Sequence, residues 1–273
     1  MYFDELRGFL SWLRSRDIDI FVEKNFARYL EENDCGLDSS EIVENVPEDV
    51  DIVASIGGDG TFLHASDWVG GKQIPIMGIN TGHLGYLTGY SFADFSKIEQ
   101  AFDGEYEVSS RMTIEVHSDF LPEGFSPYAL NEVSISKGDT TSMVEIHALI
   151  DGRYLADYLA DGLVISTPTG STAYNLSCGG PIVEPTLDSF VLSPIAPHSL
   201  TLRPLVVGPG SKLSFEVKSR GSQCHIGVDG RTFVVPADGT LIQVSIAPYR
   251  VKVVQPPATD FASVLRSKLL WGG

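Results

Sequence analysis

The chain has few cysteines and no long apolar segment. Its three cysteines, Cys35, Cys178 and Cys224, form no Cys-x-x-Cys pair and leave one over, so we predict a reducing compartment and no disulfide framework. No apolar run reaches about 18 residues, and residues 1–7 do not show a basic segment followed by an apolar core. We therefore expect a cytoplasmic protein that does not associate with membranes.

Basic residues are also scarce. The 19 Lys and Arg residues stand against 36 Asp and Glu, which gives a formal net charge of −17. Such a charge argues against non-specific binding of nucleic acid or of an anionic membrane. A polyanionic substrate would have to be held by backbone N–H groups, hydroxyls and a divalent cation, so we expect dependence on Mg²⁺.

Two common nucleotide-binding patterns are missing as well. The chain has neither a G-x-x-x-x-G-K-[ST] run nor a G-x-G-x-x-G after a strand. It has instead Gly-Gly-Asp-Gly-Thr at residues 57–61, between a predicted strand at 50–56 and a predicted helix at 61–68. A strand-to-helix turn of this kind offers free N–H groups and a positive helix end to a phosphate, and its glycines let the ligand come close.

Asp59 is the one charged group in that turn. A carboxylate beside a polyphosphate is unfavourable unless it has a specific task, and two tasks fit: holding Mg²⁺, or accepting a proton from a hydroxyl that attacks a phosphate. The other interpretation is a plain Gly-Asp-Gly surface turn.

The hydrophobic pattern predicts two domains with different rhythms. At 273 residues, with 43% hydrophobic and 20% charged residues, the chain is long and apolar enough for two ordered cores. The first part alternates helices and apolar strands, which predicts a parallel sheet: helices at 3–15, 25–32 and 61–68, strands at 18–22, 50–56 and 74–79. After residue 105 short alternating strands predict a mostly antiparallel β domain: 112–117, 132–136, 144–150, 154–159, 212–217, 224–228, 232–235 and 241–246, with Asp-Gly hairpin turns at 151–152 and 229–230 and a last helix at 261–270.

Three further segments carry candidate binding groups. Residues 80–86 form a second glycine-rich turn after strand 74–79, at the sheet edge where open α/β sheets bind ligands. We expect Tyr86 in this turn either to stack on a base or to pack in the core. For His83 we expect a structural or capping role. Residues 161–177 place hydroxyls and small residues around a Pro-Thr-Gly turn, which suits a base or ribose but also a Ser/Thr-rich connector. Asn131 and Glu132, at the start of a strand, could bind ribose hydroxyls or cap a loop.

Taken together, these segments resemble the NAD kinase family, which phosphorylates the adenosine ribose 2′-hydroxyl of NAD to give NADP. Five blocks occur in the family's order: residues 57–61, 80–87, 130–132, 161–183 and 194–204. Diacylglycerol and sphingosine kinases and 6-phosphofructokinases carry turns similar to the first block. The block at 161–183 separates the NAD kinases from them.

The resemblance implies a role for each matching residue. Asp59 would be the catalytic carboxylate, and Gly57, Gly58, Gly60 and Thr61 the phosphate- and ATP-binding turn. The residues implied in NAD binding are Asp59, Gly60, Tyr86, Asn131, Glu132, Asp161, Thr169, Thr172, Ala173, Tyr174, Ser177 and Ala196. The donor would be ATP or polyphosphate with Mg²⁺, and no residue is assigned to the metal.

The resemblance also implies an architecture. It is an α/β phosphate-donor domain with a parallel sheet at 1–105, a β-rich NAD-binding domain at 106–255, and a tail at 256–273 that returns to the first domain. The family assembles as homodimers and homotetramers in which neighbouring subunits help to build the site. The chain departs from the pattern in starting with a helix rather than an apolar strand, and in Tyr86, Gly89 and Cys178, where Phe, an acidic residue and Ala are usual.

Two other functions use the same features. A lipid or sugar kinase would share the glycine turn, but the acidic composition disfavours a lipid surface. A non-catalytic NAD(P)-binding sensor would share the dinucleotide-binding groups, but it has no use for Asp59 beside a phosphate.

Overall fold

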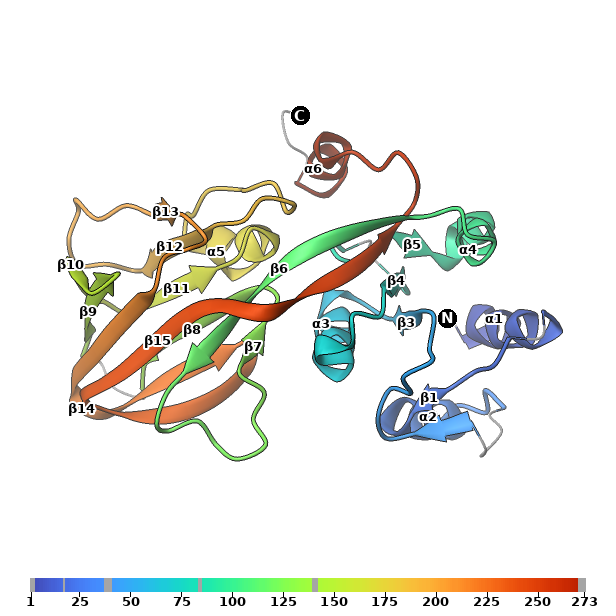
Figure 1. The fold of residues 1–273 in the computed structure, drawn as a ribbon, viewed down its shortest axis with the longest axis horizontal. Helices are drawn as coiled ribbons and strands as arrows, with labels where there is room; N and C mark the ends of the chain where they lie inside the picture. The colour runs from blue at the N-terminus through green and yellow to red at the C-terminus, as the bar shows by residue number, and fades with distance from the viewer. Residues whose placement is uncertain (1–2, 17, 37–40, 83–84, 139–141, 270–273) are drawn as a thin grey trace. The chain divides into compact units, whose positions relative to one another are not determined.

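The structure, a computed structural model, describes residues 3–16, 18–36, 41–82, 85–138 and 142–269 (Figure 1). The chain divides into two compact units: Met1–Val108 with Val254–Gly273 (unit 1), and Ser109–Val253 (unit 2). The predicted fold class is confirmed, since unit 1 is α/β with a small parallel sheet, unit 2 holds antiparallel strands, and the C-terminal segment belongs to unit 1. Within the described ranges, none of the helices combines the length and apolar character that crossing a membrane demands.

The strand–helix–strand order produces the parallel sheet of unit 1. β3 (Val53–Ile56) pairs in parallel with β4 (Ile76–Asn80), and β4 pairs in parallel with β5 (Tyr90–Ser91). The crossover between β3 and β4 contains α3 (Asp59–Val69), so the turns after both strands emerge at one edge of the sheet. The other elements of unit 1 are α1 (Phe3–Ser15), β1 (Val22–Glu23), α2 (Lys24–Glu32), β2 (Ile42–Val43), η2 (Gly70–Lys72), η3 (Phe92–Asp94), α4 (Phe95–Phe102) and α6 (Phe261–Leu269).

The apolar stripe of α1 serves two cores. Phe9 lies in a cluster with Met77 and Ile79 of β4, and Leu6 lies in a second cluster with Leu30 of α2. All five side chains are buried. These contacts attach α1 to the sheet that carries the glycine-rich turns, and α2 to α1.

The predicted strand at 18–22 is wrong. Only Val22 and Glu23 join a ladder, as β1, and their partner is β2 in a separate two-stranded parallel sheet. Ile18 and Ile20 are partly buried against the core with α1 and β4, but their backbone forms no strand. The apolar residues of this short run are therefore partly buried although no neighbouring strand pairs with their backbone.

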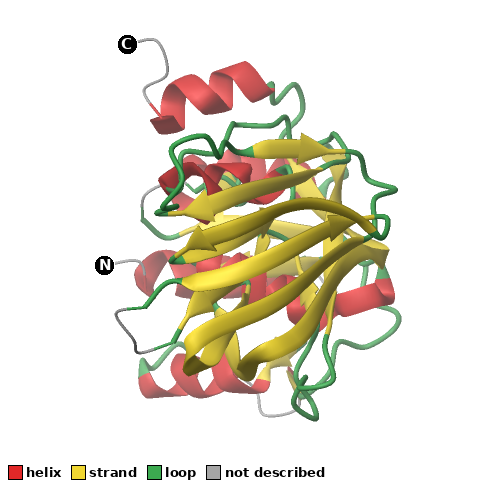
Figure 2. Ribbon diagram, turned by 90° about the vertical axis from the view of Figure 1, so that its left-hand side faces the viewer, coloured by secondary structure: helices red, strands yellow, loops and turns green. Residues whose placement is uncertain are grey.

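Alternating apolar residues build the antiparallel sheet of unit 2 (Figure 2). Neighbouring strands follow the order β13-β12-β11-β8-β14-β15, while β9 pairs with β14 and β10, and β6 pairs with β15 and β7. The bounds are β6 (Glu107–His117), β7 (Tyr128–Ala129), β8 (Glu132–Lys137), β9 (Val144–Ile150), β10 (Arg153–Ala160), β11 (Gly162–Ser166), η4 (Thr169–Thr172), α5 (Tyr174–Ser177), β12 (Phe190–Ile195), β13 (Leu205–Val207), β14 (Leu213–Val228) and β15 (Arg231–Gln255).

Two of these strands are longer than predicted. The segments expected at 212–217 and 224–228 are one strand, β14, and those at 232–235 and 241–246 are one strand, β15. The pairing of β14 with β15 shifts register between Val217 and Gln223, where the alternation in the sequence is interrupted. The stretch between Val217 and Gln223 thus belongs to a continuous strand, although its sequence is typical of a connecting loop.

Both Asp-Gly hairpin turns are confirmed. Asp151 and Gly152, between β9 and β10, have φ of 51° and 72°, and Asp229 and Gly230, between β14 and β15, have φ of 46° and 80°. Two consecutive positive φ angles are typical of the type I′ turn, for which Asp-Gly is a preferred pair.

Candidate active site

The first glycine-rich turn joins β3 to α3. Gly57 has φ of +153°, and a Cβ there would lie 2.3 Å from Thr61 Oγ1, so the turn requires glycine. The Gly57 N–H donates to the carbonyl of Ile79 (2.9 Å) and extends the pairing of β3 with β4. Gly58 is the N-cap of α3 and supplies no side-chain cap. The exposed first turn of α3 thus offers its N–H groups and positive end to an anion.

Asp59 is the first residue of α3, two positions before the predicted helix start at Thr61. Its Oδ2 accepts a hydrogen bond from the Tyr86 N–H (2.8 Å) and its Oδ1 accepts one from the Leu87 N–H (3.1 Å). A Cβ at Gly85 would lie 1.9 Å from Asp59 Oδ1, so the second glycine-rich turn contacts the carboxylate directly. Each carboxylate oxygen has a second lone pair, which leaves Asp59 able to accept a further proton or hydrogen bond.

The second turn, residues 80–88, is held by its own side chains. Asn80 Nδ2 donates to Thr88 Oγ1 (3.1 Å), and Asn80 Oδ1 accepts from the Gly82 N–H (2.5 Å). The Gly85 N–H also donates to Thr88 Oγ1 (2.9 Å). This network fixes the backbone that holds Asp59; His83, for which we expected a structural or capping role, lies outside the described residues.

Tyr86 is the aromatic residue of the second turn. Its ring is partly buried, and burial, followed by the charge of Asp59, raises the pKa of its phenol. The buried Oη has no hydrogen-bond partner among the described residues. Buried polar atoms are nearly always paired, so this hydroxyl is a candidate for contact with a ligand.

In unit 2, three strands end at the second group of predicted residues. Glu132 begins β8 opposite Ser166, the last residue of β11, and Val133 pairs with Val228 at the end of β14. The turn after β14 contains Asp229, whose carboxylate accepts hydrogen bonds from the N–H groups of three consecutive residues: Leu130 (2.6 Å), Asn131 (2.9 Å) and Glu132 (3.0 Å). Asp229 therefore fixes the Asn131–Glu132 backbone.

This role of Asp229 was not predicted from the sequence. Asp229 was predicted only as part of a hairpin turn, which the local residues explain completely. The contacts of Asp229 span 97 to 99 residues of sequence, and nothing in the local pattern indicates them. Burial raises the pKa of Asp229 to about 6, although the three N–H donors and Arg231 act in the opposite direction.

Glu132 lies beside Asp229 with its side chain largely enclosed. Its Oε2 is buried and without a hydrogen-bond partner in the part of the chain that the structure describes. Burial, then the neighbouring charge of Asp229, raises the pKa of Glu132 to about 7, while a hydrogen bond from the Tyr174 N–H opposes the shift. A carboxyl group in this state can either donate or accept a hydrogen bond near neutral pH.

We predict that Glu132→Gln increases thermal stability more at pH 8 than at pH 5. The folded-state pKa of about 7 exceeds the ordinary value of 4.5, so the folded protein binds this proton more tightly than the unfolded chain does. The resulting stabilisation is complete below about pH 4.5 and is lost as the pH rises through about 7. Glutamine is neutral at every pH, so the variant does not lose stability in this way as the pH rises. Melting temperatures of wild type and variant at both pH values provide the test.

The control for this prediction is Glu145→Gln on β9. Glu145 is an exposed carboxylate of unit 2, so its change in melting temperature should be small at both pH values. An effect of Glu132→Gln that is equal at pH 5 and pH 8, or larger at pH 5, would contradict the assignment.

The Pro-Thr-Gly turn lies directly against Asn131. A Cβ at Gly170 would be 2.1 Å from the Asn131 carbonyl oxygen, so glycine permits this approach. Thr167 joins the two segments, since its Oγ1 donates to the Leu130 carbonyl (2.6 Å) and accepts from the Gly170 N–H (3.0 Å). Thr169 is buried with its Oγ1 unpaired among the described residues, which makes it a second candidate for a ligand contact.

A buried amide holds α5 behind this turn. Asn175 Nδ2 donates to the carbonyls of Ser171 (2.9 Å) and Pro181 (3.0 Å), and Asn175 Oδ1 accepts from Ser193 Oγ (2.6 Å). A Cβ at Gly180 would lie 2.0 Å from Asn175 Oδ1. The small residues and hydroxyls of 161–183 thus include both an internal framework and groups open to a ligand.

Asp161 and Ala196 meet at the other end of β11. Gly162 pairs with Ile195, so the residues flanking that pair, Asp161 and Ala196, lie at one strand end. Asp161 Oδ1 forms an ion pair with Lys137 Nζ (2.6 Å). Ala196 is exposed with φ of +45°, a strained backbone conformation for a residue with a Cβ.

Tyr174 lies between the two ends of β11. Burial raises the pKa of its phenol, and the charges of Cys178, Glu132 and Asp161 act in the same direction. Tyr174 is 42% exposed, so this aromatic side chain is accessible to a ligand. The other predicted residues of this segment are half-buried or exposed: Thr172, Ala173 and Ser177.

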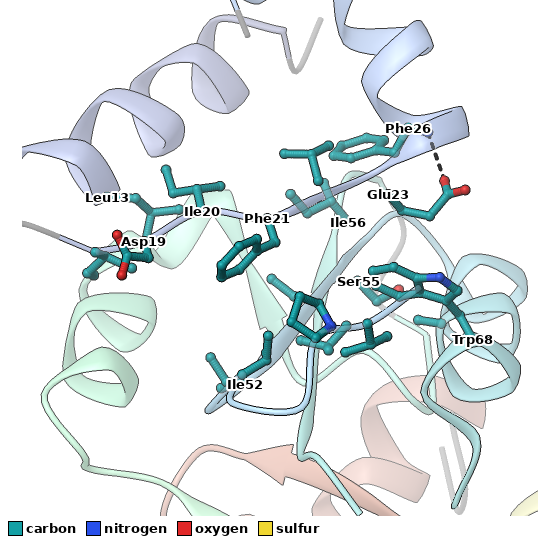
Figure 3. Close-up of a pocket in the computed structure, with 18 of the residues that line it drawn as sticks. Leu13, Asp19, Ile20, Phe21, Glu23, Phe26, Ile52, Ser55, Ile56 and Trp68 are labelled. Carbon is teal, nitrogen blue, oxygen red and sulfur yellow. Dashed lines mark hydrogen bonds between the residues drawn. The ribbon is translucent and has the colours of Figure 1, made fainter. Parts of the chain in front are cut away.

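Unit 1 also contains a cavity of about 720 Å³ beside β3 (Figure 3). Its walls are mainly apolar and include Ile20, Phe21, Ile56 and Trp68. The charged side chains that line it are all acidic, among them Asp19 and Glu23 of the labelled residues. Such a surface repels a polyphosphate. Thr61 of the glycine-rich turn also lines this cavity.

Comparison with known proteins agrees with this geometry. The family model described as "ATP-NAD kinase N-terminal domain" matches residues 8–106, and the one described as "ATP-NAD kinase C-terminal domain" matches residues 130–256. The chain belongs to the NAD kinase family. An NAD kinase of Porphyromonas gingivalis is 41% identical over 275 residues, which cover 98% of this chain and 92% of that protein.

Solved structures of the NAD kinase family have the same fold. The yeast NADH kinase complexed with NADH superposes with a TM-score of 0.84 at 25% identity, covering 99% of this chain and 84% of that one. An NAD kinase from Archaeoglobus fulgidus in complex with ATP has a TM-score of 0.70 at 27% identity, covering 89% and 94% of the two chains. The resemblance stated from the five sequence blocks is therefore confirmed.

Proposed function

We propose that this chain transfers the γ-phosphate of ATP to the adenosine ribose 2′-hydroxyl of NAD, giving NADP. The observation that carries the proposal is the Asp59 carboxylate, held by two backbone N–H groups at the first turn of α3. A fixed carboxylate beside an anion-binding helix end is the pair of groups that phosphoryl transfer to a hydroxyl requires. Membership of the NAD kinase family supports the substrate pair.

Unit 1 is the phosphate-donor domain in this proposal. The N–H groups of the turn formed by Gly57, Gly58, Gly60 and Thr61 bind the phosphates of ATP, and the glycines allow close approach. Mg²⁺ would be held mainly by these phosphates; the described residues contain no group of three His, Cys, Asp or Glu side chains that could hold a metal ion. This fits the usual binding of Mg²⁺ through substrate phosphates, waters and at most one or two carboxylates. The ion would neutralise the negative charge of the phosphates, because this acidic protein offers few basic groups to do so.

Asp59 is the catalytic residue. Its two N–H partners leave lone pairs on the carboxylate that accept the proton of the 2′-hydroxyl. The 2′-oxygen attacks the γ-phosphorus in line, the bond from that phosphorus to the β–γ bridging oxygen breaks, and ADP leaves. Phosphoryl transfer needs little covalent chemistry from the protein, so positioning provides much of the rate enhancement. The network of the second turn supplies that positioning by holding the donors to Asp59 in place.

Unit 2 is the NAD-binding domain. Two buried oxygens without protein partners among the described residues, Glu132 Oε2 and Thr169 Oγ1, support a ligand at this surface. Asn131, Glu132 and Asp161 would bind the hydroxyl and amide groups of the dinucleotide. Its adenosine side would contact Thr169, Thr172, Ala173, Tyr174 and Ser177, with Ala196 nearby.

We further propose that the protein acts in the cytoplasm as a homodimer or homotetramer. The three cysteines are free, which suits a reducing compartment. The expectation of an oligomer comes from the NAD kinase family and is tested by light scattering of the purified protein.

The decisive experiment follows NADP formation by the purified protein from NAD, ATP and Mg²⁺, with and without EDTA. An NADP-specific coupled dehydrogenase provides the signal. We expect NADP that depends on both ATP and the metal. Replacing ATP with polyphosphate in the same assay tests the second donor.

The absence of NADP formation with either donor would overturn the proposal. Calorimetry then separates the remaining functions: NAD binding without turnover would indicate the sensor, and binding to lipid vesicles would indicate the lipid kinase.

A further inference from the structure

Lys268 of α6 has an enclosed but unpaired ammonium group. Its Nζ is buried and forms no hydrogen bond within the described ranges. No residue of α6 is buried as a whole; Lys268 is half-buried, and its basic neighbour Arg266 is exposed. An ammonium carries three donors, and burying them unpaired is unfavourable by several kcal/mol in general. A group in this state suits an acceptor that the protein itself does not supply.

The charge that acts on Lys268 is that of Asp59. Burial lowers the pKa of Lys268 to about 8, and the negative charge of Asp59 opposes this shift. Both groups belong to unit 1. The oxygens of Asp59 accept backbone hydrogen bonds from Tyr86 and Leu87, and neither accepts one from Lys268 Nζ. The carboxylate therefore attracts the ammonium through its charge without satisfying its donors.

We propose that Lys268 binds the phosphate chain of the donor beside Asp59 and stabilises the phosphoryl group during its transfer. This inference rests on the proposed function. Phosphate oxygens accept charge-assisted hydrogen bonds from an ammonium, and they supply the acceptors that Lys268 lacks. A fixed cation at a transferring phosphoryl group also neutralises charge that the turn's N–H groups only partly offset. In a chain of net charge −17, such a cation has few substitutes.

The competing explanation is that Lys268 only attaches α6 to unit 1. In that case its removal would lower stability and affect both substrates equally. A phosphate-binding role instead predicts a selective effect on the donor, because the NAD-binding groups belong to other segments. It also predicts that a permanently charged arginine changes the pH dependence.

The test compares the full-length variants Lys268→Gln, Lys268→Arg and the control Arg266→Gln. Initial rates are measured while ATP is varied at saturating NAD and while NAD is varied at saturating ATP, and melting temperatures are recorded. Calorimetry with tripolyphosphate and Mg²⁺ measures phosphate binding without turnover. We expect Lys268→Gln to lower kcat/KM for ATP by about 10²-fold, as for loss of one preorganised donor, with KM for NAD changed less than about twofold.

The variants are expected to separate further. Arg266→Gln should resemble wild type, and Lys268→Arg should retain donor affinity. The kcat/KM of wild type for ATP should fall above about pH 8, where Lys268 deprotonates; the charged group that acts on Lys268 is Asp59. Lys268→Arg should not show this fall, because arginine stays protonated. The pH profile of Lys268→Arg decides the question if Lys268→Gln fails to fold.

Two outcomes would overturn the inference. The first is an unchanged kcat/KM for ATP in Lys268→Gln. The second is an equal loss for ATP and NAD together with a lower melting temperature. Wild-type protein that forms no NADP would instead refute the proposed function, so the two failures are distinguishable.

Discussion

Asp59→Asn is expected to lower kcat by about 10²- to 10⁴-fold, the usual contribution of a positioned general base. The amide has the size of the carboxylate but cannot accept the proton of the 2′-hydroxyl. Its NH₂ group would also face one of the two N–H donors, Tyr86 or Leu87, and lose that hydrogen bond. NAD affinity should stay nearly unchanged, because the proposed NAD-binding groups are mostly in unit 2.

Steady-state kinetics with calorimetry of NAD binding measure this result. Asp51→Asn is the matched control, since Asp51 is an exposed carboxylate just before β3, the strand that leads to Asp59. Retention of more than about a tenth of the wild-type kcat by Asp59→Asn would exclude the role of base. A large loss of NAD affinity would show that Asp59 mainly organises the second turn.

Gly170→Ala is expected to lower kcat/KM for NAD at least about tenfold and to destabilise the fold by about 1–3 kcal/mol, the range for overpacking a dense site. The new Cβ would lie 2.1 Å from the Asn131 carbonyl oxygen and 2.7 Å from its Cα. These are backbone atoms and cannot rotate away. The collision must displace either the turn at Thr169 or the Asn131–Glu132 segment, and both contribute to the proposed NAD site.

Gly210→Ala is the control for this prediction. A Cβ at Gly210, also in unit 2, meets no atom within 4 Å and its φ is not in the left-handed region. Melting temperature, kcat and KM are measured for both variants. Wild-type stability and an unchanged KM for NAD in Gly170→Ala would show that the contact between the turn and Asn131 is dispensable.

Much of the fold could be predicted because it depends on local patterns. The helix at 3–15, the parallel pair of β3 and β4, and both Asp-Gly hairpins follow from apolar periodicity and turn chemistry. The strand at 18–22 was predicted wrongly because its apolar residues are buried without a ladder partner, and a sequence does not reveal whether a partner strand is present.

Sequence also determined the chemistry of the candidate site. Five ordered blocks with a carboxylate, glycines and hydroxyls were enough to identify the NAD kinase family. Residue types and their spacing can be seen in the sequence itself. What it left open for each residue was the choice between a ligand contact and a structural role.

Only the tertiary structure shows which atoms already have partners, and the choice between these roles depends on that. The sequence indicated a functional carboxylate at Asp59. The hydrogen bonds that it accepts from the Tyr86 and Leu87 N–H groups span 27 and 28 residues of sequence, so the local pattern does not reveal them. The sequence predicted Asp229 only as a turn residue, and Lys268 only as part of the last helix, at 261–270. Only folding lets Asp229 hold the Asn131–Glu132 backbone and leaves the Lys268 Nζ enclosed and unpaired near the charge of Asp59. Long-range hydrogen bonds and burial depend on the whole chain.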